Sequence, residues 1–182
     1  MDYTENMLSR EDIYRGRIIY VHKDTVSLPN GGEGIREIVE HSGGVTVLPL
    51  DANGDVYCVR QYRYAYGTHM LETPAGKLEP DEDPLACAVR ELSEETGFTA
   101  DEFVYLGEIY PSPGYCKESL YLYLALGLHP GEKHLDPDEF LEVEKYSLDT
   151  LLDMVTDGQL CDAKTVTAVL MAKRWLDGKE KR

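Results

Sequence analysis

The chain has 182 residues, enough for one packed globular domain with a small appendage but too few for two domains of ordinary size. Asp and Glu outnumber Lys and Arg by 34 to 18, and the formal net charge of -16 argues against nucleic acid as a partner. Four scattered cysteines argue against a zinc site or disulfide framework, no apolar run would span a bilayer, and we therefore expect a soluble cytoplasmic protein.

The first part of the chain predicts short β-strands over residues 13–28 and 35–41. A turn-forming Pro-Asn-Gly-Gly stretch at 29–32 separates them. Because a lone hairpin is marginal in water, these strands need a further surface to pack on. We therefore expect residues 1–42 to form a small antiparallel β-subdomain, and residues 43–182 to form the main domain.

The main domain is predicted as a mixed sheet with few helices, that is, an α/β chain of the α+β type. Strands are expected over residues 45–50 and 56–62, around an Asn-Gly turn, and again over 103–110 and 120–126. A loop rich in Pro, Gly and acid follows at 128–139. Two helices are expected at the carboxy end, one after Ser147 and one after Asp162.

A further helix between these strands has clear ends. Asp83 is a good N-cap, Pro84 suits the first helical position, and Gly97 suits a left-handed stop. Four apolar residues recur at helical spacing, so we expect them to face the core. They are Leu85, Ala88, Val89 and Leu92.

The same helix carries Glu91, Glu94 and Glu95 at positions i, i+3 and i+4, so their carboxylates share one face. Like charges this close repel one another, which costs stability unless cations lie among them. Carboxylate oxygens are hard donors that suit Mg²⁺ or Mn²⁺. Taken alone, the pattern is also compatible with an ordinary solvated face.

The residues around the helix decide between these interpretations. The stretch from Gly76 to Phe98 matches every fixed position of the pattern Gly, five residues, Glu, seven residues, Arg-Glu, apolar, any, Glu-Glu, any, Gly, apolar. The matching positions are Gly76, Glu82, Arg90, Glu91, Leu92, Glu94, Glu95, Gly97 and Phe98. In this pattern the chain resembles the Nudix hydrolase family.

The resemblance implies a Nudix-like α/β/α sandwich with a loop-helix-loop metal site for Mg²⁺ or Mn²⁺. It makes Glu91 and Glu95 the main metal ligands, and Glu94 a further ligand or a contact through water. The backbone carbonyl of Ala75 would complete the set. Around them, Glu82, Gly76 and Gly97 would maintain the structure of the site, and Arg90 would fix the carboxylate rotamers.

Segments outside this pattern are similar to the ADP-ribose pyrophosphatase subgroup: VRQYRYA at 59–65, LETPAG at 71–76 and YPSPGYCKE at 110–118. Relatives that act on GDP-mannose share parts of them. By this match Arg63 contacts substrate phosphate and Glu72 lies near the terminal ribose or the metals. Pro113 lies sixteen residues after Gly97, as in the subgroup. Thr73 departs from the pattern, since relatives usually carry a bulky apolar residue there.

A general base is expected on the loop at 134–140, where Glu139 is the first choice and Asp136 and Asp138 are alternatives. The resemblance further implies a homodimer that exchanges its amino-terminal strands and places Arg36 over the partner's nucleotide pocket. The predicted function is Mg²⁺-dependent hydrolysis of ADP-ribose, a nucleoside diphosphate, to AMP and ribose 5-phosphate. The alternatives are another nucleotide sugar, such as GDP-mannose, and a non-catalytic nucleotide-binding module.

Overall fold

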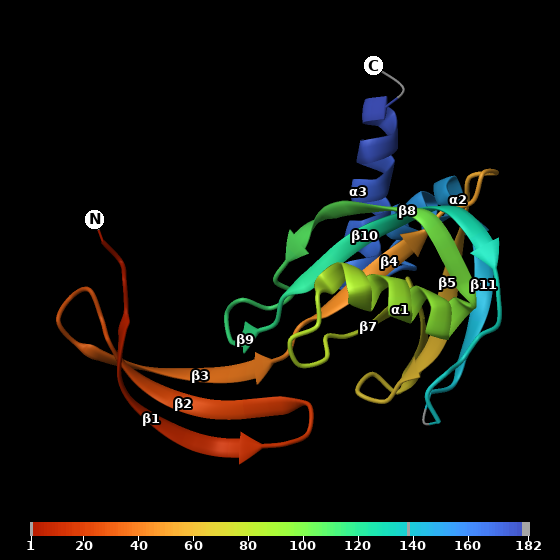
Figure 1. The fold of residues 1–182 in the computed structure, drawn as a ribbon. Helices are drawn as coiled ribbons and strands as arrows, with labels where there is room; N and C mark the ends of the chain where they lie inside the picture. The colour runs from red at the N-terminus through yellow and green to blue at the C-terminus, as the bar shows by residue number, and fades with distance from the viewer. Residues whose placement is uncertain (1, 138, 180–182) are drawn as a thin grey trace. The chain divides into compact units, whose positions relative to one another are not determined.

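The computed structural model describes residues 2–137 and 139–179 (Figure 1). The chain forms two compact units. The first comprises Met1–Gly43 and Tyr110–Ser119, and the second comprises Gly44–Ile109 and Leu120–Arg182. The first unit thus combines the amino-terminal segment with Tyr110–Ser119, which is distant in sequence, and the domain boundary at residue 42 stays a prediction.

The first unit is a sheet with strand order β1-β2-β3-β9. Strands β1 (Asn6–Arg15), β2 (Ile19–Ser27) and β3 (Glu33–His41) pair in antiparallel fashion, as expected, and the short β9 (Cys116–Lys117) adds in parallel to β3. Every residue of β1 is exposed, including the apolar Met7, Leu8, Ile13 and Tyr14.

The second unit contains two sheets. In the mixed sheet, β7 (Ala75–Lys77), β4 (Gly44–Pro49), β10 (Leu120–Pro130) and β8 (Phe98–Ile109) lie in that order, and β4 and β10 run parallel. The other sheet, with order β11-β5-β6, is antiparallel and contains β11 (Leu141–Ser147), β5 (Asp55–Arg63) and β6 (Thr68–Glu72). The helices are α1 (Pro84–Thr96), α2 (Leu148–Thr156) and α3 (Ala163–Lys179).

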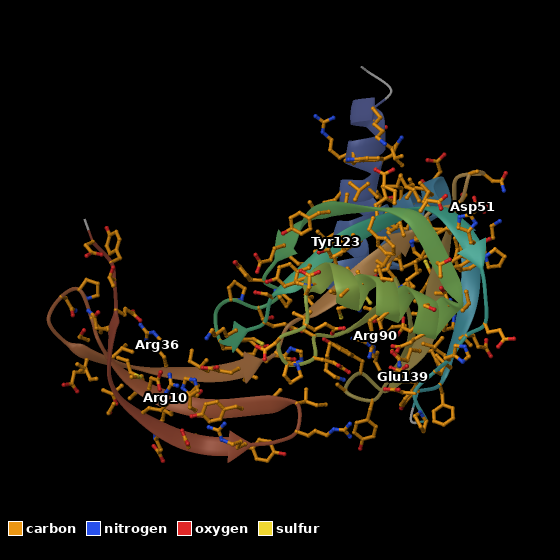
Figure 2. All side chains as sticks on the ribbon, in the orientation of Figure 1. Arg10, Arg36, Asp51, Arg90, Tyr123 and Glu139 are labelled. Atoms are coloured by element: carbon orange, nitrogen blue, oxygen red, sulfur yellow. The ribbon has the colours of Figure 1, made fainter. Side chains whose placement is uncertain are left out.

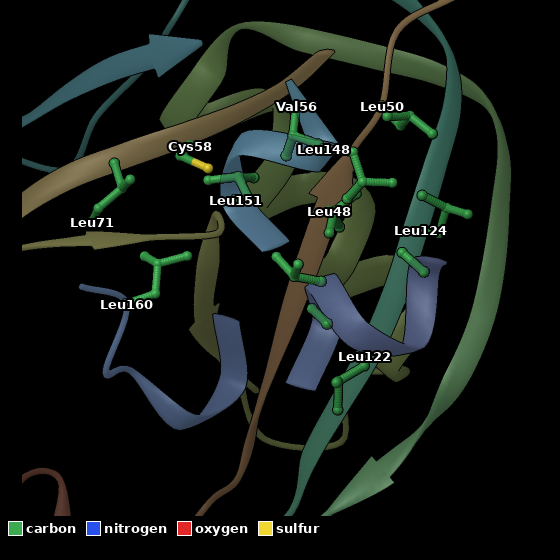
Figure 3. Packing of buried hydrophobic residues seen from close by; sticks show 13 residues of the cluster. Leu48, Leu50, Val56, Cys58, Leu71, Leu122, Leu124, Leu148, Leu151 and Leu160 are labelled. Atoms are coloured by element: carbon green, nitrogen blue, oxygen red, sulfur yellow. The ribbon is translucent and has the colours of Figure 1, made fainter. Parts of the chain in front are cut away.

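Strands β4 and β10 are buried on both faces, which explains their nearly continuous apolar sequences. On one face, Val45, Val47 and Tyr123 pack in a cluster with residues of α1. On the other face, Leu48 and Leu122 join a larger cluster that includes residues of β5, α2 and α3 (Figure 3). The mixed sheet is thus sandwiched between α1 and the carboxy-terminal helices, which confirms the predicted α/β/α arrangement.

Several strands extend beyond or lie outside the predicted ranges. The expected strand at 120–126 continues to Pro130, because β8 begins directly after α1 and pairs with β10 along that length. Strands β6, β7 and β11 were not predicted. The three residues of β7 are too few for a sequence pattern, and they form a strand only because β4 provides hydrogen-bonding partners.

Helix α1 has the predicted ends. The Asp83 side chain accepts hydrogen bonds from the backbone N–H groups of Leu85 and Ala86, and Gly97 closes the helix at φ 76°. The predicted buried stripe is partly wrong, however, since Leu85 and Val89 are 42% and 44% exposed. Compared with the predicted orientation, the helix is rotated about its axis. Glu91 and Glu95 are therefore buried together with Ala88 and Leu92. This rotation brings the two carboxylates against β7.

Candidate active site

The buried carboxylates of Glu91 and Glu95 are in close contact with β7. Glu95 is 2% exposed, and its Oε2 accepts a hydrogen bond of 3.0 Å from the backbone N–H of Ala75. Glu91 is 7% exposed and lies over Gly76, where an added Cβ would come within 1.8 Å of Oε1. Only glycine leaves room for that carboxylate, which gives Gly76 a steric reason for its place in the pattern.

Arg90 joins three carboxylates with one guanidinium. It donates to Oε1 and Oε2 of Glu82 at 2.9 and 3.0 Å, to Oε1 of Glu91 at 2.7 Å and to Oε2 of Glu94 at 2.9 Å. The hydrogen bonds from Arg90 are the main reason that the pKa of Glu82 falls to about 2. Arg90 thus contacts three of the acidic side chains, and its role in fixing their rotamers stays a prediction.

The negative charge around Glu95 is less well compensated. Burial raises the pKa of Glu95 to about 8, and the charges of Glu91 and Glu139 act in the same direction. Burial also raises the pKa of Glu91, against the opposing charge of Arg90. The surroundings of Glu91 and Glu95 thus disfavour the charged form of both carboxylates.

The loop before β11 reaches the end of α1. The backbone N–H of His134 donates to the carbonyl of Glu94 at 3.1 Å. Gly97 lies against the same loop, since a Cβ there would come within 3.0 Å of the carbonyl of Gly131. These contacts keep the loop that bears Glu139 beside the acidic helix.

Among the candidate bases, the charge of Glu139, which is labelled in Figure 2, acts on both Glu91 and Glu95. Its backbone N–H donates to the carbonyl of Asp136 at 2.9 Å, while the Asp136 residue is exposed. Asp138 lies outside the described residues. The choice among them stays a prediction.

Arg63 and Glu72 form a second charged group. Nε and Nη2 of Arg63 donate to the two carboxylate oxygens of Glu72, both at 2.6 Å. The third residue of this charged group is Lys164 of α3, which also pairs with Glu72 and was not predicted from the sequence. A signal was present, because a lysine in the first turn of a helix opposes the helix dipole.

Two other predicted site residues lie in the first unit. Arg36 donates from Nε to Oε2 of Glu5 at 2.9 Å, and Pro113 lines a surface hollow together with Ile38 and Tyr115. Their proposed contacts with a nucleotide stay predictions.

The acidic face of α1 has the donor chemistry of a divalent-cation site. Among the described residues, no three His, Cys, Asp or Glu side chains already converge on one point. One reason is that Arg90 occupies oxygens of Glu91 and Glu94. The carboxylates nevertheless fit a hard cation, since Glu91 and Glu95 are buried oxygen donors whose raised pKa values a bound cation would lower.

Comparison with known proteins identifies the family of the chain. Residues 40–170 match the model described as NUDIX domain, and residues 5–39 match the nucleoside diphosphate sugar hydrolase N-terminal domain. The chain therefore belongs to the Nudix hydrolase family, whose members generally use divalent metal ions.

Individual relatives cover nearly the whole chain. An ADP-ribose pyrophosphatase of Bacillus subtilis strain 168 is 39% identical over 91% of this chain and 90% of its own length. A methanol dehydrogenase activator of Bacillus methanolicus is also 39% identical, over 92% and 91%. A crystal structure of an ADP compounds hydrolase superposes with a TM-score of 0.85 at 24% identity, over 96% of this chain and 95% of that one. The fold is thus a Nudix fold.

Proposed function

We propose that this Nudix hydrolase cleaves the diphosphate of ADP-ribose to AMP and ribose 5-phosphate with Mg²⁺, or Mn²⁺, as cofactor. The observation that carries the proposal is the pair of buried carboxylates, Glu91 and Glu95, on a helix that ends at Gly97, a fixed position of the family pattern. The similarity to an ADP-ribose pyrophosphatase over nine-tenths of both chains supports the choice of substrate.

A divalent cation held by Glu91, Glu95, Glu94 and the carbonyl of Ala75 would neutralise diphosphate charge and lower the pKa of the attacking water. Arg90 holds Glu91 and Glu94 in place while substrate binds.

Arg63 binds a phosphate of the substrate in this proposal. Its guanidinium already makes two parallel hydrogen bonds to the Glu72 carboxylate, and the same geometry suits two phosphate oxygens. Glu72 is 1% exposed, so its effect on the substrate acts through Arg63.

Glu139 accepts the proton of the attacking water. The water oxygen bonds to one phosphorus atom, the bond from that phosphorus to the bridging oxygen breaks, and the second phosphate leaves. Glu139 suits this role because its charge reaches both Glu91 and Glu95.

The proposal includes a cytoplasmic homodimer. All four cysteines are free, and Cys58 and Cys87 are buried, as is usual in a reducing compartment. Among the described residues, no helix has the length and apolar character required to cross a membrane. The exposed apolar residues of β1, together with Arg36 on β3, suit exchange of these strands with a second copy.

The test is incubation of the purified protein with ADP-ribose and Mg²⁺, followed by chromatography for AMP and ribose 5-phosphate. GDP-mannose and other nucleotide sugars are assayed in parallel, and EDTA serves as the metal control. Faster hydrolysis of GDP-mannose would move the substrate assignment to that sugar. Binding of ADP-ribose without turnover would favour a non-catalytic nucleotide-binding module.

A further inference from the structure

Glu72 has two cationic partners that differ in their access to solvent. Arg63 holds both carboxylate oxygens and its side chain is 40% exposed, whereas the side chain of Lys164 is only 11% exposed. The carboxylate between them is 2% exposed. One partner of this buried charge can therefore reach a ligand in solution, while the other is held inside the protein.

The position of Lys164 is unfavourable for an isolated helix. It is the second residue of α3, where the positive end of the helix dipole repels an ammonium group. Asp162, just before the helix, offsets this, since its Oδ2 accepts from Lys164 Nζ at 2.9 Å and from the Thr165 N–H at 3.0 Å. A residue that is unfavourable for its own helix is usually explained by the contacts that its side chain makes elsewhere in the fold.

Buried threonines fix the start of α3 against the segment that carries Glu72. Oγ1 of Thr165 accepts a hydrogen bond from the backbone N–H of Thr73 at 2.9 Å, and Oγ1 of Thr73 lies 2.7 Å from Oγ1 of Thr46. All three threonines are fully buried. This network explains why a hydroxyl replaces the usual apolar side chain at position 73, and it holds Lys164 firmly on Glu72.

We propose that Lys164 is a positioning residue for the diphosphate: it keeps Glu72 neutralised when Arg63 moves from that carboxylate to a substrate phosphate. Removal of the only partner of a buried carboxylate is costly, because the remaining charge is left without solvent or counter-ion. With Lys164 in place, Arg63 exchanges one anion for another at little cost. The inference rests on the proposed function, in which Arg63 binds phosphate.

The charges of this group also reach the acidic face of α1. Hydrogen bonding to Glu72 is the main cause that raises the pKa of Arg63, and the charge of Glu95 adds to it. Burial dominates the raised pKa of Glu95, while the charge of Lys164 opposes that rise. Arg63 and Lys164 are therefore within electrostatic range of the candidate metal ligands.

The first experiment is a set of steady-state kinetics with ADP-ribose. In Lys164→Met, Arg63 is the one ion-pair partner of Glu72 that remains among the described residues. KM should therefore rise by roughly 10-fold, the middle of the range for coupled charges, with kcat nearly unchanged. In the Glu72→Gln background the same substitution should leave KM unchanged, because no buried carboxylate retains Arg63. An equal rise of KM in both backgrounds would overturn the proposal.

The second experiment needs no substrate. Phenylglyoxal modification of Arg63, followed by peptide mass spectrometry, reports how often the guanidinium leaves Glu72. The rate should fall in Lys164→Met and rise in Glu72→Gln, and an unchanged or faster rate in Lys164→Met would contradict the proposal. If the wild type hydrolyses no nucleotide sugar, the proposed function fails, and these rates alone decide the role of Lys164.

A matched control separates this role from a general loss of basic charge. Lys145 on β11 forms ion pairs with Asp51 at 3.1 Å and Asp55 at 2.9 Å, and its side chain is more exposed than that of Lys164. Lys145→Met should leave both KM and the modification rate of Arg63 at wild-type values. Thermal unfolding of every variant checks that the fold is retained.

Discussion

Glu72 and Glu95 are buried to the same extent, at 1% and 2% exposure, but they differ in the charges around them. Burial alone would raise the pKa of Glu72, yet Arg63 and Lys164 hold it below its ordinary value. Glu95 is hydrogen-bonded by one backbone N–H group, and burial raises its pKa to about 8. The Glu72 carboxylate has two cationic partners, whereas Glu95 makes no ion pair within the part of the chain that the structure describes, and this difference is the reason for proposing a cation site on α1.

Neutralising the α1 carboxylates should have the largest effect. Each of Glu91→Gln and Glu95→Gln is expected to lower turnover of ADP-ribose by at least about 100-fold, more than the usual loss for an outer-shell partner. The folded state should be kept, because burial disfavours the charge of Glu95, and because Arg90, the partner of Glu91, retains its contacts with Glu82 and Glu94. Kinetics and thermal unfolding measure the two effects.

Glu102→Gln, an exposed residue on β8, is the control for loss of a surface carboxylate. If both α1 variants keep wild-type turnover, Glu91 and Glu95 hold no catalytic cation, and the contrast with Glu72 has no functional meaning.

Gly76→Ala tests the same carboxylates without changing any charge. The added methyl group would occupy the space of the Glu91 carboxylate, and displacement of a reacting group by about 1 Å can cost about 100-fold in rate. Turnover should fall by about that factor. Gly178→Ala, where an added Cβ meets nothing within 4 Å, should leave turnover unchanged, and equal rates for the two variants would contradict the packing argument.

Arg90→Lys should have a smaller effect. The ammonium keeps the charge but cannot make the forked contacts to Glu82, Glu91 and Glu94, so a loss of about 10-fold in turnover is expected. Isothermal titration with Mg²⁺ should show weaker binding in parallel. Arg174→Lys, at an exposed position of α3, is the control; full activity of Arg90→Lys would mean that the fork is unnecessary.

The smallest expected effect is on the stability of the fold. It follows from the pKa of Glu72, which is lowered in the folded protein. Such a group stabilises the fold above the pKa of the unfolded chain, about 4.3, and this contribution is lost as pH falls through the lower folded value. The free energy of unfolding should therefore differ most between wild type and Glu72→Gln at about pH 6, and least at about pH 3. Urea unfolding at both pH values measures this difference, and a constant gap would refute it.

The ends of α1 and the shared face of its glutamates could be predicted because their determinants are local. Asp83, Pro84 and Gly97 set its ends, and the spacing of Glu91 and Glu95 places both on one face whatever surrounds the helix. The direction of that face could not be predicted. The hydrophobic pattern favoured burial of Leu85 and Val89, but contact with β7 buries Glu91 and Glu95 instead. This contact could not be predicted, because β7 is a strand only through its pairing with β4.

For a similar reason, the sequence marked one ion-pair partner of Glu72, Arg63, but not the other, Lys164. Arg63 and Glu72 lie on neighbouring paired strands, and a family pattern marks both. Lys164 is 92 residues further along the chain and reaches Glu72 only because α3 is fixed by Thr73 and Thr165. The one local sign of this long-range contact is a lysine in the first turn of a helix, where the helix dipole disfavours a positive charge.

The close approach of Gly97 to Gly131 has a practical consequence for protein engineering. Gly97 ends the helix at positive φ, and its missing side chain also admits the backbone of the loop that leads to Glu139. A chimaera that receives this loop from a relative must therefore carry glycine at both positions. With another residue at either position, its Cβ would come too close to the backbone carbonyl of the other segment.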